Sequence, residues 1–128
     1  MKPSTKQAIA TLLPRYPVLA PCEPDLTAAV EALIATYEHH GKLIACGNGG
    51  SAADAEHIVG ELMKGFLLPR KLGADWQAKF EAACPASADY FLENLQGTLP
   101  AISLVNAVAL GTAFANDQAP DLVFAQQV

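Results

Sequence analysis

A histidine and a glutamate four residues apart, His57 and Glu61, are the side chains of this sequence whose types and spacing suit chemistry best. On a helix this spacing places both side chains one turn apart on the same face. An imidazole nitrogen and a carboxylate oxygen so placed could ligate a zinc ion, or act as a general base with an orienting partner. An ordinary solvated helix face carries the same spacing, so both interpretations stay open from this pair alone.

A glycine-rich turn, Gly47-Asn48-Gly49-Gly50-Ser51, precedes this pair and follows an apolar run. A turn of this kind between a strand and a helix directs several unpaired backbone N–H groups, with the helix dipole behind them, at one spot. Glycine lets a bulky ligand approach the backbone, and Ser51 can cap the helix or donate its hydroxyl. A phosphate, a carboxylate or a sugar hydroxyl would fit, and the alternative is a tight turn without a ligand.

Two nucleotide-binding loops are disfavoured at this turn. The Walker pattern requires a lysine before its final serine or threonine, and Gly50 stands there. Gly47, Gly49 and Ala52 match the dinucleotide pattern formally, but that pattern needs a second strand ending in an acidic residue about 20 residues on. Residues 69–75 offer no such strand.

The composition indicates one folded domain, because 52% of the 128 residues are hydrophobic and only 16% are charged. The net charge is −5 and the eight basic residues are scattered, which excludes the electrostatic footprint of a nucleic-acid partner. The three cysteines show no metal-ligand spacing. The N-terminal segment lacks an apolar run that could serve as a signal peptide or membrane span, so we expect a cytoplasmic protein.

The elements that must position these residues follow from hydrophobic periodicity. Short apolar runs at 42–46 and 99–105 predict two buried strands, and each is followed by helical segments. Residues 52–66 are predicted to form a helix whose apolar stripe is opposite a polar face; the stripe is Ala55, Val59, Leu62 and Phe66, and the polar face is Asp54, His57 and Glu61. This order predicts βαβ units and a parallel sheet. Two strands do not close an α/β layer, so either a partner chain completes the sheet or the sequence is the first part of a longer domain.

The remaining segments are predicted to be mostly helical. One helix is expected to start at a cap at Asp25 and to stop at Gly41, with His39 and His40 in its last turn. The other expected helices cover residues 4–13, about 90–95, 106–115 and 121–128. Residues 14–24 form a proline-punctuated connector, residues 67–85 a partly helical excursion, and Asn116-Asp117 a turn.

Two segments, 46-CGNGGSAADAEHIVGEL-62 and, less specifically, 114-FANDQAPDLVFAQQV-128, resemble the sugar isomerase (SIS) domain family and, within it, the phosphoheptose isomerases. The resemblance implies a three-layer, flavodoxin-like α/β fold with a parallel sheet, assembled as a homotetramer with active sites between subunits. It divides the chain into an N-terminal helix and connector, residues 1–24, and the N-terminal portion of a SIS domain, residues 25–128, which stops after the second strand unit.

The same resemblance implies an aldose–ketose isomerase that converts sedoheptulose 7-phosphate into D-glycero-D-manno-heptose 7-phosphate. Asn48, Gly49, Gly50 and Ser51 would line the sugar-phosphate site, and Asn116 and Asp117 would bind sugar hydroxyls. His57 and Glu61 would be zinc ligands, and Glu61 would also be the catalytic acid and base.

Three departures from the family pattern bear on this interpretation. The family's Ser/Thr-rich phosphate loop and its later glutamine and histidine have no counterpart, so the 128 residues alone are expected to be inactive. Lys64 and Gly65 stand where an arginine is common, and the stretch from Leu67 to Leu95 is longer than in the plainest members, which leaves the sugar open. The alternatives are a non-catalytic SIS module that binds a sugar phosphate or a protein partner in regulation, and a different sugar-phosphate isomerase.

Overall fold

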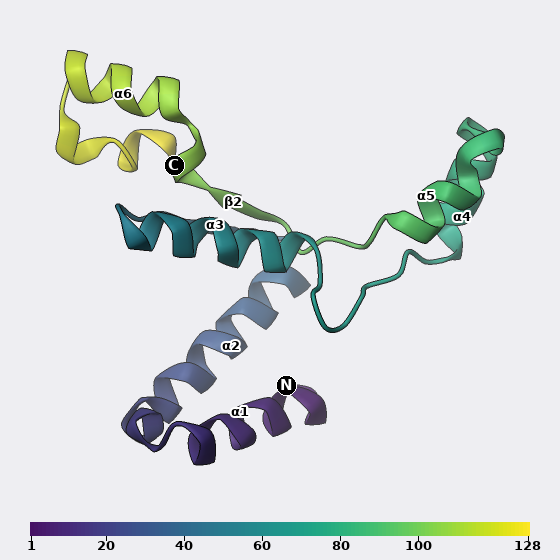
Figure 1. Cartoon of the computed structure of the whole chain (residues 1–128), viewed down its shortest axis with the longest axis horizontal. Coiled ribbons are helices and arrows are strands. Elements are labelled where there is room, and N and C mark those ends of the chain that lie inside the picture. The colour runs from purple at the N-terminus through teal and green to yellow at the C-terminus, as the bar shows by residue number, and fades with distance from the viewer. The chain divides into compact units, whose positions relative to one another are not determined.

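The computed structural model describes all 128 residues as two compact units, Met1–Lys42 and Leu43–Val128, each of which is considered by itself (Figure 1). In the first unit, α1 (Pro3–Arg15) and α2 (Glu23–Glu38) are joined by a 3-10 turn, Pro17–Cys22, and form a helical hairpin. The domain boundary expected at residue 24 stays a prediction. None of the helices combines the length and the apolar character that a membrane crossing requires.

The start and the end of α2 differ from the expected ones in detail. The helix begins at Glu23, with Pro24 in its first turn where proline is tolerated, and no side chain caps it, so the predicted Asp25 cap is wrong. His39 and His40 lie just beyond the last turn. His40 has a left-handed φ of 57°, and the Gly41 N–H donates to the Thr36 carbonyl oxygen at 2.8 Å, which closes the helix in the Schellman manner.

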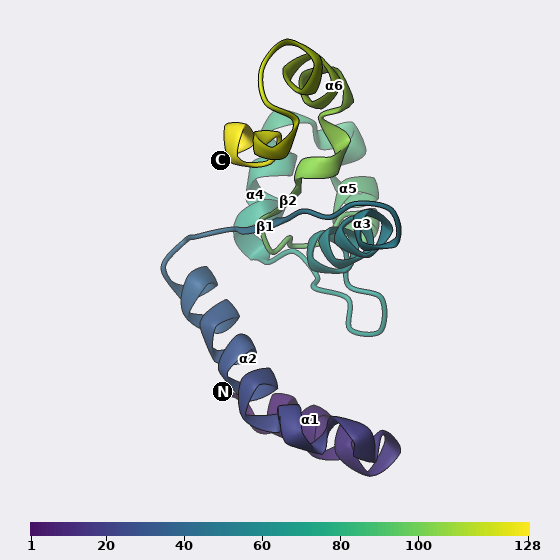
Figure 2. The same cartoon turned by 90° about the vertical axis from the view of Figure 1, so that its left-hand side faces the viewer.

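The second unit is built on two parallel strands, β1 (Leu43–Ala45) and β2 (Ala101–Ser103), which confirms the predicted strand pair and the α/β class. Helix α3 (Gly50–Met63) follows β1 and packs on both strands (Figure 2). Its buried contact is Ala55, only 3% exposed. Side chains alternate across a sheet, and Ile44 and Ile102, paired across the two strands, are 41% and 46% exposed. The sheet of this chain therefore keeps a half-exposed apolar row.

Helix α3 ends three residues before the expected boundary, and the prediction that Phe66 belongs to its buried stripe is wrong: Phe66 is 72% exposed. The chain leaves the helix at Lys64, whose backbone is extended with φ −139° and ψ 115°, and Arg70 stabilises this end of α3. Its guanidinium donates from Nη2 to the Leu62 carbonyl oxygen at 2.6 Å and from Nε to the Gly97 carbonyl oxygen at 2.8 Å. A cation suits the last carbonyls of a helix, so Arg70 caps α3 and ties it to the segment that enters β2.

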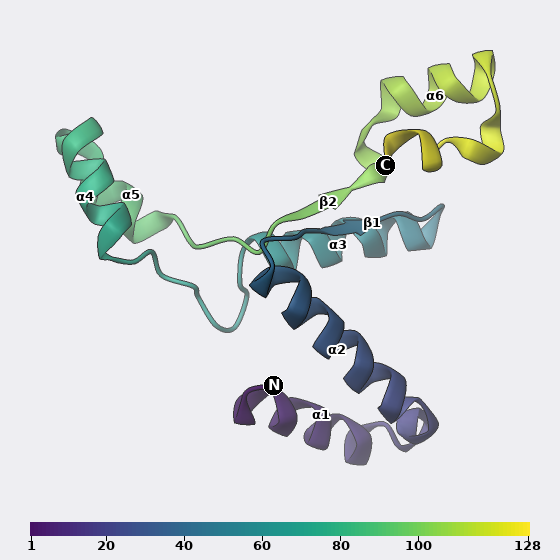
Figure 3. The same cartoon turned by 180° about the vertical axis from the view of Figure 1, so that it is seen from behind.

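The excursion between α3 and β2 is partly helical, as expected, with α4 (Ala74–Ala83) and α5 (Ala88–Asn94) packed against each other (Figure 3). The rings of Phe80 and Phe91 lie 5.3 Å apart between centroids, within the range of favourable aromatic pairs. This helical pair has its own small apolar contact region.

The segment after β2 forms α6 (Val108–Asp117), which starts and ends two residues later than expected. The helix predicted over residues 121–128 is wrong, because the chain there makes separate 3-10 turns at Pro120–Leu122 and Ala125–Gln127. The Gln127 N–H donates to the Phe124 carbonyl oxygen, three residues back. Short segments gain few i→i−4 hydrogen bonds, and the tighter 3-10 turn competes there.

Candidate functional site

The three glycines of the turn differ in what the fold requires of them. A Cβ at Gly47 would lie 2.5 Å from the Ser51 carbonyl oxygen, so the backbone approaches too closely for a side chain. Gly49 has φ 57° and ψ −123°, a conformation that residues other than glycine avoid. A Cβ at Gly50 would meet nothing within 4 Å. Close packing therefore explains Gly47 and backbone conformation explains Gly49, but neither explains Gly50.

The turn exposes backbone donors at the start of α3. Gly49 is the N-cap, and no side chain, including that of Ser51, caps the helix. The Ser51 N–H donates to the Asn48 carbonyl oxygen at 3.2 Å, whereas the N–H groups of residues 47–50 have no backbone acceptor. These free donors, together with the positive end of the helix dipole, suit an anionic or hydroxyl-bearing ligand.

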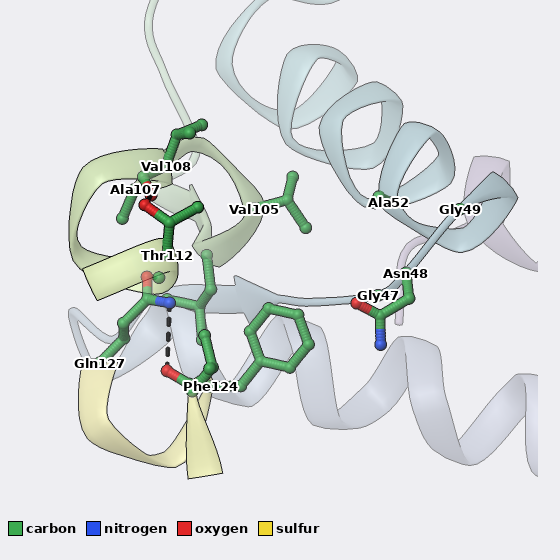
Figure 4. A pocket seen from close by; sticks show the side chains of 13 residues that line it. Gly47, Asn48, Gly49, Ala52, Val105, Ala107, Val108, Thr112, Phe124 and Gln127 are labelled. Carbon is green, nitrogen blue, oxygen red and sulfur yellow. Dashed lines mark hydrogen bonds between the residues drawn. The ribbon is translucent and has the colours of Figure 1, made fainter. Parts of the chain in front are cut away.

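A pocket of ≈ 290 Å³ lies beside this turn (Figure 4). Asn48, Gly49 and Ala52 contribute one wall, and the opposite wall comes from the chain after β2, with Thr112, Phe124 and Gln127 among its residues. None of the residues that line the pocket is charged. An anion in the pocket would thus depend on backbone N–H groups for its binding.

His57 and Glu61 lie side by side on the exposed surface of α3, as their spacing predicts. The distance from His57 Nε2 to Glu61 Oε1 is 3.6 Å, and the two side chains are 77% and 49% exposed. This distance is an ion-pair contact when the imidazole is protonated and is too long for a hydrogen bond. The carboxylate therefore keeps its oxygens accessible to a ligand.

The pocket and the His57–Glu61 pair lie on opposite sides of α3. His57 lies about two helical turns after Gly50, and Glu61 about three turns after it, so the three residues share one side of the helix. Ala52, which lines the pocket, is about two and a half turns from Glu61 and so lies on the other side. The rise of the helix adds about 13 Å between Ala52 and Glu61. A ligand in the pocket is out of reach of the Glu61 of the same chain.

The donor set of this chain does not complete a zinc site. Catalytic zinc takes three protein ligands and structural zinc four, with a ligand distance near 2 Å for nitrogen and oxygen. His57 and Glu61 supply two donors, and no group of three histidine, cysteine, aspartate or glutamate side chains gathers in the structure.

Asn116 and Asp117, expected to bind sugar hydroxyls, end α6 and are exposed. The Asn116 side-chain N–H donates to the Asp117 carboxylate at 2.7 Å. Neither residue lines the pocket, nor do Gly50 and Ser51. Assignment of these residues to substrate binding stays a prediction.

Three residues that line the pocket were not predicted from the sequence: Thr112, Phe124 and Gln127. The sequence signal that could have found them is the spacing of the apolar pair Val123 and Phe124 and of Gln127. In the structure these three residues are half-buried on one face of the final turns, while Ala125 and Gln126 are exposed. A glutamine on the inward face of such a segment indicates a polar function, but the wall that it faces comes from residues far away in sequence.

Comparison with known proteins places the fold and the glycine turn in one family. Residues 17–109 match the SIS domain family, which covers more than half of the chain and includes both strands, the glycine turn and the His57–Glu61 pair. The chain belongs to the SIS domain family, as its motifs suggest.

Several relatives carry the name phosphoheptose isomerase. The one from Roseiflexus sp. (strain RS-1) is 34% identical over 105 residues, which cover 82% of this chain and 40% of the relative. The one from Helicobacter pylori is 37% identical over 103 residues, 80% of this chain and 40% of the relative. A shorter match to the Azoarcus sp. (strain BH72) protein reaches 49% over 45 residues. The chain thus spans about 40% of the length of the first two relatives.

Proposed function

We propose that the protein is an aldose–ketose isomerase acting on a sugar phosphate, with sedoheptulose 7-phosphate as substrate and D-glycero-D-manno-heptose 7-phosphate as product. The observation that carries this proposal is the His57–Glu61 pair, at 3.6 Å, on the helix whose N-terminus is the glycine turn. The relatives named phosphoheptose isomerase support the choice of reaction. A site that only bound a sugar phosphate would need the turn but not the pair.

In the proposed mechanism the carboxylate of Glu61 moves one proton between neighbouring carbons. It takes the proton from C1 of the ketose, the C1–C2 enediol forms as the carbonyl oxygen at C2 gains a proton, and Glu61 returns its proton to C2 while the C1 hydroxyl gives up its own. The sum is an aldose with no net gain or loss of protons. General acid–base catalysis of this kind contributes about 10²–10⁴-fold. His57 lies beside the carboxylate and attracts it when its imidazole is protonated.

The substrate is proposed to lie between two copies of the chain. A sugar phosphate bound at the N–H groups of the turn fills the pocket, on the side of α3 opposite to Glu61. The side chains of His57 and Glu61 are 77% and 49% exposed, so water surrounds them in the single chain. An active site excludes water, which strengthens its electrostatic interactions. Glu61 of a second copy, placed over the pocket of the first, would supply both the base and the cover, which is consistent with the proposed homotetramer.

The proposal also covers a metal ion, the substrate contacts and the cellular compartment. His57 and Glu61 are proposed as two ligands of a zinc ion, and Asn48, Gly49, Gly50 and Ser51 as the sugar-phosphate contacts. Asn116 and Asp117 are proposed to bind hydroxyls. The protein is proposed to work in the cytoplasm, without nucleic acid.

The competing function is a SIS module that senses a sugar phosphate or binds a protein partner without turnover. Incubation of the intact protein with sedoheptulose 7-phosphate, followed by separation of ketose and aldose phosphates, distinguishes the two. We expect equilibration of the two sugars. Binding without equilibration would favour the sensor, and equilibration of another ketose phosphate in its place would keep the reaction class but change the substrate.

A further inference from the structure

The two walls of the pocket differ in hydrogen-bonding character. The near wall, at the glycine turn, presents backbone N–H donors without backbone acceptors. On the far wall, the Gln127 side chain donates from Nε2 to the Val123 carbonyl oxygen at 3.2 Å. Only the NH₂ group of an amide can donate to a carbonyl oxygen, so the orientation of this side chain is fixed and Gln127 Oε1 remains available as an acceptor.

Thr112 adds a second acceptor to the far wall. Its hydroxyl donates to the Val108 carbonyl oxygen at 2.8 Å, within its own helix. A hydroxyl has a single hydrogen, so Thr112 Oγ1 can offer the pocket only its lone pairs. In Figure 4 the side chains of Thr112 and Gln127 lie on the same side of the pocket, and the Phe124 ring lies between the Gln127 amide and the Asn48 amide.

This arrangement selects among ligands by their polarity. An anionic group suits the near wall, where N–H groups and the helix dipole point at it, and is repelled by acceptors on the far wall. Hydroxyl groups suit the far wall because they can donate to Gln127 Oε1 and Thr112 Oγ1. The apolar ring of Phe124 suits the C–H groups of a carbon chain between the two ends, in the manner of a pocket with few, well-placed polar groups.

We propose that Thr112 and Gln127 form a hydroxyl-binding subsite which, with the phosphate at the glycine turn, sets the orientation of the sugar chain in the pocket. This inference rests on the proposed function and deepens it, because it makes Gln127 a specificity-determining residue for polyhydroxylated phosphates. Gln126, its neighbour, is exposed and does not line the pocket.

The test compares sedoheptulose 7-phosphate with inorganic phosphate, which carries no hydroxyl chain, by calorimetric titration of the intact protein. Gln127→Met keeps the side-chain length and removes the amide, and we expect it to weaken binding of the sugar phosphate about tenfold, as the loss of one hydrogen bond does, without changing phosphate affinity. Thr112→Val should act in the same direction. Gln126→Met is the matched control and should change neither affinity.

The outcomes separate this inference from the function on which it rests. Unchanged sugar-phosphate affinity in both Gln127→Met and Thr112→Val would overturn the subsite while leaving the function standing. Equal weakening of both ligands would overturn it as well, since that result indicates a general disturbance of the pocket. A wild-type protein that binds inorganic phosphate but no sugar phosphate would remove the proposed function and the subsite together.

Discussion

Replacing Glu61 with glutamine in the intact protein is expected to lower the turnover of sedoheptulose 7-phosphate by about 10²–10⁴-fold, the usual contribution of a general base. Glutamine keeps the size of the side chain but cannot accept a proton from carbon. Glu61 is 49% exposed and its side chain contacts that of His57, which is 77% exposed, at 3.6 Å, so the substitution removes no buried contact. The KM and the thermal unfolding temperature should therefore change little, and the loss should appear in kcat.

Glu56→Gln is the matched control for this variant. Glu56 lies on the same helix, is also exposed, and is about 140° around the axis from Glu61, away from the pair. Its substitution should leave kcat within a factor of two or so of the wild-type value, as expected for a surface change. If Glu61→Gln retained wild-type kcat, Glu61 would have no part in the proton transfer.

Replacing Gly50, one of the proposed sugar-phosphate contacts, with valine is expected to lower kcat/KM for the sugar phosphate by about 100-fold. Gly50 does not line the pocket, but a side chain at this first residue of α3 would stand beside the free N–H groups of the turn. The fold gives no reason for the glycine, since a Cβ at Gly50 meets nothing within 4 Å. The thermal unfolding temperature should therefore stay the same or rise, because glycine is the poorer helix former.

Gly60→Val provides the control for an open glycine on the same helix, because a Cβ at Gly60 also meets nothing within 4 Å. This variant should keep its affinity for the sugar phosphate. An active, tightly binding Gly50→Val protein would show that no ligand approaches the turn from that side. By contrast, Gly49→Val would be ambiguous, since φ 57° strains any side chain there irrespective of a ligand.

Local sequence patterns predicted the parts of this fold that depend on near neighbours. The apolar runs flanking Leu43–Ala45 and Ala101–Ser103 indicated the strands, and the order of elements indicated that they are parallel. Helical spacing placed His57 and Glu61 on one face of α3, and the structure brings their side chains to 3.6 Å.

The features that the sequence interpretation missed depend on residues brought together from far apart. Helix α3 ends at Met63, where Arg70 caps the Leu62 carbonyl group and also binds Gly97, a contact across 27 positions that no periodicity encodes. The far wall of the pocket comes from residues after β2, which reach the glycine turn only because the two strands pair. The position of the pocket, on the side of α3 away from Glu61, could not be predicted without that pairing.

We infer that one copy of the chain supplies the glycine turn and pocket of each site while a second copy supplies Glu61. The most direct test is to mix two inactive variants of the intact protein, Ala52→Phe, whose ring would fill the pocket that Ala52 lines, and Glu61→Gln, under conditions in which subunits exchange, and to measure turnover of sedoheptulose 7-phosphate. A dimer with one copy of each variant has two sites, each built from both copies. One of these sites carries both defects and the other carries none. Random mixing should then restore about a quarter of the wild-type activity.

Formation of mixed oligomers is verified independently by native mass spectrometry, so that a negative result is informative. Recovery of activity well above the sum of the two parent proteins is the predicted result. Mixed oligomers that form but show no more activity than the parents would contradict the account, because they would place the turn and the catalytic carboxylate of each site in the same chain.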